Sequence, residues 1–195
     1  MYYPTRENLQ GALLELLKER SLDDITAKMV CQRAGVSRQT LYNHYYCLMD
    51  IYQEVLLQDL ETATTGCNTY LTWADGYRVI LECLERHRAD VLHVFRSSYR
   101  EELLQTLERF GGGLVGRGIE QCAADLDLRA PDEDKEFLQN LYMHAFMGVI
   151  RHWLEKGMRL SPAYMASRCE AVMHHSIRDS LKRLEQMESV APVDI

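Results

Sequence analysis

Apolar side chains recur along most of this chain at the spacing of an α-helix. Leu9, Leu13 and Leu16 lie four and three positions apart, so they form one apolar stripe on a helix predicted at about 6–20. Similar patterns predict further helices at about 48–65, 74–86, 89–97, 100–126, 131–157 and 161–187. No segment shows the strict alternation of apolar and polar residues that is typical of a half-buried strand.

Two shorter helices are predicted near the N-terminus. Thr26 is a favourable N-cap for a helix at 27–34, and Ser37 is one for a helix at 38–44. Gly35 lies between them, and glycine readily takes the left-handed conformation that ends a helix. A short helix, a tight turn and a second short helix form a helix-turn-helix. We therefore expect an all-α protein of about nine helices, with a three-helix head over residues 1–47 and a helical bundle body over 48–195.

The second half of the chain carries both helix-breaking and helix-starting signals. Five glycines lie between Gly111 and Gly118, inside the helix predicted at 100–126. Because glycine is a poor helix former, we expect this helix to be kinked or broken there. Ser161 followed by Pro162 predicts the start of the last helix, which we expect to run without a break to about Met187.

Charge is unevenly distributed along the chain. The net charge is −7, but residues 1–50 hold six Lys or Arg and six acidic residues, so the excess of negative charge lies in 51–195. No carboxylate occurs between Asp24 and Asp50. Because a carboxylate would repel nucleic-acid phosphates, an acid-free stretch suits a surface that faces them.

Composition and motifs argue against several other classes. Apolar residues make up 47% of the chain and charged residues 26%, as in an ordinary globular protein. No apolar run is long enough for a transmembrane helix and no signal peptide is evident, so we expect a cytoplasmic protein without membrane contact. The six cysteines form no CxxC pair, and the histidines lack partners at metal-ligand spacing. Since no nucleophile elbow or phosphate-binding loop occurs either, we expect no catalytic site, metal or cofactor.

The segment 26–45 carries a specific motif. Ala34-Gly35-Val36-Ser37 is followed by Thr40-Leu41-Tyr42 and His44-Tyr45, and this string resembles the DNA-binding unit of the TetR family of bacterial regulators. The motif resemblance covers about 5–57, and beyond it the likeness is one of architecture. It implies a sequence-specific DNA-binding repressor that is released by a small-molecule effector and binds a palindromic duplex as a homodimer.

The helix-turn-helix supplies the predicted DNA contacts. Arg38 can pair with guanine and Gln39 with adenine in the major groove, whereas Lys28 would reach the phosphate backbone. The predicted DNA-binding residues are Thr26, Lys28, Ser37, Arg38, Gln39, Thr40, Tyr42, Asn43 and His44.

The resemblance also implies two sites in the body. The family pairs its last two long helices with those of a second subunit, and the matching interface residues are Leu141, Ala145, Gly148, His152, Cys169, Met173 and Ile177. The family's body usually holds an effector pocket, and its polar or aromatic candidates are Trp73, His93, Arg96, Tyr99, Phe110, Tyr142 and His144.

One departure from the family pattern keeps an alternative open. The family usually has a lysine near the start of the fourth helix, where this chain has Tyr46-Cys47-Leu48, with no Ser, Asp or Asn cap. A missing phosphate contact weakens DNA binding and lowers its salt dependence. The stretch from Phe146 to Pro162 also resembles a Gram-positive branch containing activators of dihydroxyacetone-kinase operons, which work with protein partners. The alternative function is therefore a protein-binding co-regulator with weak or no DNA binding.

Overall fold

The computed structural model describes residues 5–67 and 71–187, and this part of the chain is all-helical with no strand, as predicted. A short 3-10 helix at Leu22–Asp24 joins the first two helices. The α-helices are α1 (Thr5–Leu17), α2 (Ala27–Ala34), α3 (Arg38–His44), α4 (Leu48–Ala63), α5 (Trp73–Arg86), α6 (Arg88–Phe95), α7 (Arg100–Asp125), α8 (Asp132–Glu155), α9 (Pro162–Met173) and α10 (Ser176–Gln186).

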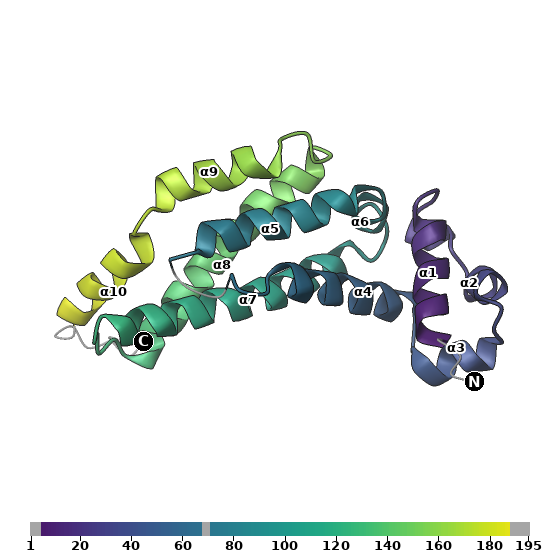
Figure 1. Ribbon diagram of the computed structural model, residues 1–195, viewed down its shortest axis with the longest axis horizontal. Coiled ribbons are helices and arrows are strands. Elements are labelled where there is room, and N and C mark those ends of the chain that lie inside the picture. The colour runs from purple at the N-terminus through teal and green to yellow at the C-terminus, as the bar shows by residue number, and fades with distance from the viewer. Residues whose placement is uncertain (1–4, 68–70, 188–195) are drawn as a thin grey trace, which may run out of the picture.

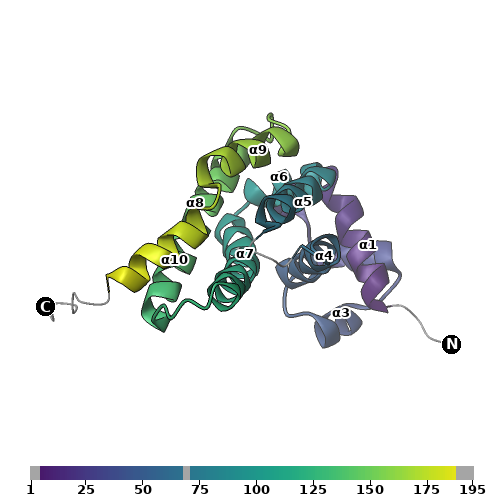
Figure 2. The same cartoon turned by 60° about the vertical axis from the view of Figure 1, so that its left-hand side comes forward.

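The molecule is elongated, with α1, α2 and α3 gathered at one end and the remaining helices forming a long body (Figure 1). Helices α4 and α7 run along the body with α5 beside them (Figures 1 and 2). Helix α9 packs on α5, and α10 lies at the end of the body away from the head (Figure 1). None of the helices in 5–67 and 71–187 is long and apolar enough to cross a membrane.

Helix α4 contacts both parts of the molecule. Arg6 of α1 forms an ion pair with Glu54 of α4 at 3.0 Å, which holds α4 against the head. Gln53, one residue earlier, donates its side-chain N–H to the hydroxyl of Thr106 on α7 at 2.9 Å. Because one helix packs on both parts, the boundary placed after residue 47 remains a prediction.

The expected break in the glycine-rich helix was wrong, since α7 continues through all five glycines. The glycines instead let α8 lie close to α7. A Cβ on Gly116 would lie 2.7 Å from the side-chain oxygen of Gln139, and one on Gly111 would lie 3.2 Å from the Met143 methyl group. Packing against α8 therefore compensates for the poor helix propensity of this stretch.

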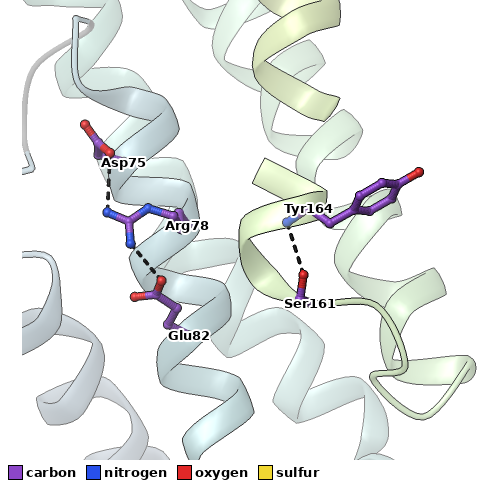
Figure 3. Close-up of polar contacts among 5 residues, drawn as sticks. All are labelled: Asp75, Arg78, Glu82, Ser161 and Tyr164. Atoms are coloured by element: carbon purple, nitrogen blue, oxygen red, sulfur yellow. Dashed lines mark hydrogen bonds and ion pairs between the residues drawn. The ribbon is translucent and has the colours of Figure 1, made fainter. Parts of the chain in front are cut away.

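The last predicted helix begins as expected but is divided. The Ser161 hydroxyl accepts the backbone N–H of Tyr164 at 3.3 Å, and Pro162 occupies the first turn of α9 (Figure 3). The helix ends at Met173, and His175 has a left-handed backbone with φ of +57°. The single helix predicted over 161–187 was therefore wrong, because this residue turns the chain between α9 and α10.

Candidate nucleic-acid interface

The turn between α2 and α3 forms as the sequence predicts. The Thr26 hydroxyl accepts the backbone N–H of Met29 at 3.3 Å, and the Ser37 hydroxyl accepts that of Thr40 at 3.0 Å. Gly35 ends α2 with φ of +68°, in the left-handed region. Both N-caps and the turn that connects them are therefore confirmed.

Helix α3 is anchored on one side only. Leu41 is fully buried against the head, and the hydroxyl of the buried Tyr45 accepts a hydrogen bond from Gln10 of α1 at 3.3 Å. The Arg6 guanidinium lies over the Tyr45 ring, 5.4 Å from its centre. The opposite side, which we call the α3 outer face, consists of the exposed residues Arg38, Gln39, Tyr42, Asn43 and His44.

The remaining predicted contacts lie beside this face. Thr26, Lys28 and Ser37 are exposed, at the start of α2 and just before α3. Thr40 is half-buried, and its hydroxyl lies 2.8 Å from that of Ser37, so part of its hydrogen-bonding capacity is used within the head.

The charge around the α3 outer face favours an anionic partner. No acidic residue belongs to the face. In the described part of the chain neither Lys28 nor Arg38 forms an ion pair, whereas Glu15 is paired with Arg33 at 2.9 Å. Positive charge is therefore free on this side of the head, although the protein as a whole is acidic.

Asp50 supplies the cap that the sequence was expected to lack at the start of α4. Its carboxylate accepts the backbone N–H groups of Tyr46 and Cys47, each at 2.9 Å. An acidic residue three positions after the N-cap is a known capping signal, and it could have been recognised in the sequence. The side chain of Tyr46 is 92% exposed next to α3, where the family usually offers a basic group.

The body encloses an apolar cavity of about 80 Å³ between α5, α7, α8 and α10. The ring of Phe146 lies 5.3 Å from that of Trp73 and 4.8 Å from that of Tyr77, measured between centres. The Tyr77 hydroxyl donates to the backbone carbonyl of Phe146 at 3.3 Å, and burial raises the pKa of this phenol well above its usual range. The walls therefore suit an apolar group, with few polar atoms to hold water.

The seven effector-pocket candidates are not brought together. Trp73 and Phe110 line the cavity, whereas His144 and Arg96 are exposed elsewhere on the body. Tyr142 is buried between α8 and α10, with its hydroxyl 3.4 Å from that of Ser180. The remaining two, His93 and Tyr99, lie beside the contact between the head and the body.

The contact between the head and the body joins the end of α1 and the loop after it to α6 and the start of α7. The His93 ring donates through Nδ1 to the backbone carbonyl of Leu17, and the Ser21 hydroxyl donates to the His93 carbonyl at 3.5 Å. The Asp23 carboxylate accepts hydrogen bonds from two groups of Ser98, from its backbone N–H at 2.9 and 3.2 Å and from its hydroxyl at 2.7 Å. The sequence offers no signal for this pair, because the two residues are 75 positions apart.

Most of the predicted dimer residues line an open groove of about 840 Å³ along α8 and α9, the α8–α9 groove. Ala145, Gly148, His152, Cys169 and Met173 line it. Leu141 is also exposed on α8, but Ile177 lines the inner cavity instead. The groove also includes the exposed apolar residues Val149, Leu160, Tyr164 and Val172. Tyr164 extends away from the α9 backbone (Figure 3).

A comparison with known families gives a match that covers more than half of the chain. A TetR C-terminal family model, described as a transcriptional regulator C-terminal region, matches residues 71–175. The transcriptional regulator UidR of Escherichia coli K12 is 32% identical over 60 residues. That match spans 31% of this chain and 31% of UidR.

Solved structures share the fold of most of the chain. The dihydroxyacetone kinase operon activator DhaS superposes with a TM-score of 0.70 at 16% identity, over 90% of this chain and 97% of that one. NalD, the secondary repressor of an efflux pump in Pseudomonas aeruginosa, gives a TM-score of 0.55 at 17% identity, over 87% and 94% of the two chains. A regulator from Streptomyces coelicolor gives 0.54 at 16% identity, over 94% and 90%.

Proposed function

The chain belongs to the TetR family of transcriptional regulators, and we propose that it is a repressor that binds a palindromic DNA operator as a homodimer. A small molecule in the apolar cavity releases the operator. The protein works in the cytoplasm, where it meets the DNA.

The α3 outer face is the observation that carries DNA binding. A helix in the major groove needs polar side chains that point outward, an apolar side that fixes its angle, and no carboxylate toward the phosphates. Arg38 and Gln39 are exposed at the first turn of α3, Leu41 holds the opposite side, and Lys28 is free to meet the backbone.

The α8–α9 groove supports the homodimer. Contiguous exposed apolar surface of this kind usually marks an interface, and Val172 on α9 is 84% exposed. A two-fold pair of subunits would present two equivalent copies of α3, which explains why a palindromic operator is expected.

The cavity and the head–body contact support release by an effector. Helix α7 lines the cavity through Phe110 and begins two residues after Ser98, which holds Asp23 of the head. A ligand that moves α7 would therefore change how the head sits on the body, and with it the spacing of the two α3 helices in the dimer.

The alternative of a protein-binding co-regulator rests on the start of α4, where this chain has Tyr46-Cys47-Leu48 and the family usually has a lysine. Selection from random duplex DNA at low salt separates the two functions. Enrichment of a palindromic sequence supports the repressor function, whereas the absence of any enriched sequence favours the co-regulator. A chain carrying both Arg38→Ala and Gln39→Ala is the control, because these exposed positions are not needed for folding.

A further inference from the structure

A second hollow lies next to the apolar cavity, in a groove between α4 and α7. It has an open volume of about 530 Å³, and its walls include Arg109, Gly113 and Arg117 of α7 and Glu61 of α4. We call it the α4–α7 groove. Unlike the cavity, it contains charged side chains, and its two guanidinium groups outnumber its one carboxylate.

Both arginines are available to a ligand. Neither Arg109 nor Arg117 forms an ion pair or hydrogen bond with any residue in the described part of the chain, and both are exposed. Arg78 of α5, by contrast, contacts Asp75 and Glu82 (Figure 3). Two unpaired guanidinium groups in one groove attract an anion.

The Arg117 guanidinium lies against the surface of α7 at Gly113. A Cβ at Gly113 would lie 3.4 Å from Nη1 of Arg117, so this guanidinium folds back along α7. A carboxylate in the groove could accept bidentate hydrogen bonds from it.

Phe110 lies between this groove and the apolar cavity, since it lines both. We propose that the two hollows together bind an amphiphilic effector, with its apolar body in the cavity and a carboxylate at Arg109 and Arg117. This inference rests on the proposed function, because it names the chemical class of the proposed effector. It also explains why the cavity itself has almost no polar groups, since the recognition of charge takes place outside it.

Calorimetric titration of the full chain with octanoate and with 1-octanol tests the proposal, because the two probes share a tail and differ in charge. Octanoate is expected to bind at least about tenfold more tightly than 1-octanol. Arg109→Gln and Arg117→Gln should each remove most of that difference and leave 1-octanol binding unchanged. Arg129→Gln, at an exposed arginine outside both hollows, is the matched control.

Gly113→Glu gives a second test that does not depend on removing a charge. The Cβ of the new side chain would lie 3.4 Å from Nη1 of Arg117, and its carboxylate is expected to pair with this guanidinium and so to displace octanoate but not 1-octanol. An unchanged thermal midpoint would show that the variant folds. The proposal would be overturned if the two probes bound with equal affinity or if neither bound. It would also be overturned if the arginine variants kept the full difference in affinity between octanoate and 1-octanol.

The DNA experiment keeps this proposal separate from the proposed function. Octanoate should lower the affinity of the wild-type protein for its selected duplex, and it should not do so for Arg117→Gln. If octanoate binds but the protein selects no DNA, the repressor function is wrong and the binding site stands. If DNA is selected but octanoate binds no better than 1-octanol, the proposed carboxylate site is wrong and the proposed repressor function is kept.

Discussion

The backbone N–H and the hydroxyl of Ser98 in the body both donate to the carboxylate of Asp23 in the head, at 2.9 and 2.7 Å. Asp23 lies in the 3-10 helix that leads from α1 to α2, and Ser98 lies just before α7. Because α7 runs from this contact past Phe110, the same helix touches both the head and the cavity. The orientation of α2 and α3 is therefore tied to the helix that a ligand would contact.

Removing this contact should weaken the protein modestly. Asp23→Ala and Ser98→Ala should show a coupling of about 1 kcal/mol in a double-mutant cycle, because hydrogen bonds to a carboxylate are strong but both residues are exposed to water. Urea unfolding measures the four free energies. Asp24→Ala is the control, since this exposed neighbour makes no side-chain contact in the described chain, and it should show no coupling with Ser98→Ala.

The turn of the helix-turn-helix depends on the backbone of Gly35. Gly35→Ala should lower the free energy of unfolding by about 1 kcal/mol, because φ is +68° there although nothing lies within 4 Å of the added Cβ. Gly11→Ala is the matched control. It also adds a Cβ in open space, but within α1, so it should raise the free energy of unfolding by about 0.5–1 kcal/mol. An equal loss of unfolding free energy in Gly35→Ala and Gly11→Ala would contradict the explanation from the backbone conformation of Gly35.

Features set by neighbouring residues were predictable from the sequence. The caps at Thr26, Ser37 and Ser161 and the turn at Gly35 depend on residues within a few positions, and all four are present. The all-α class was predictable for the same reason, since helical spacing is a local property of the sequence.

Features set by distant contacts were not predictable. Helix α7 is continuous because Gln139 and Met143 of α8 pack on its glycines, and no local sequence pattern indicates this packing. His93 was a reasonable pocket candidate by residue type, but it instead hydrogen-bonds to Leu17, 76 positions away. The separation of α9 from α10 depends on the backbone of His175, a residue type that gives no turn signal.

His87 should make stability depend on pH. Its ring contacts Asp90 at 3.4 Å and Asp59 at 3.0 Å, and the hydrogen bond with Asp90, together with the charges of both carboxylates, raises the pKa of His87 despite partial burial. A raised pKa means that folding favours the protonated ring. This stabilisation is complete below the unfolded-state pKa of about 6.5 and is lost as the pH rises through the higher folded-state value.

Chemical unfolding of the wild type and of His87→Gln between about pH 5 and 9 would measure this effect. The stability difference between the two proteins should be largest on the acid side and should shrink as the pH rises above about 6.5. A difference that grows with pH would show that His87 is held neutral in the folded protein.

The α8–α9 groove should hold two subunits together. Light scattering of the wild type is expected to give about 45 kDa, twice the chain mass of 22.7 kDa. Val172→Glu should shift the protein toward the monomer, because it would place charges on the exposed apolar face of α9. Leu71→Glu is the control, since Leu71 is 73% exposed but lies outside the groove. A stable 23 kDa wild-type species at micromolar concentration would refute the homodimer.

The α3 outer face predicts different roles for Gln39 and Lys28 in DNA binding. Gln39 is exposed at the first turn of α3, where a side chain can reach base edges, whereas Lys28 is exposed at the start of α2 and has no acidic partner in the described chain. Gln39→Ala should cost about 1–3 kcal/mol on the preferred duplex and relax the preference at one base pair per half-site. Lys28→Ala should weaken binding to all sequences about equally and reduce the salt slope by roughly one for each subunit bound.

Binding titrations on matched and mismatched duplexes at several salt concentrations would measure both effects. Lys182→Ala is the control for general charge, because this exposed residue lies on α10, on the far side of the body from the head (Figure 1). It should change neither the affinity nor the salt slope. If Gln39→Ala lowers affinity equally on every duplex, Gln39 contacts the backbone rather than a base. If neither Gln39→Ala nor Lys28→Ala changes binding, α3 does not enter the groove, and the co-regulator becomes the better explanation of the exposed Tyr46.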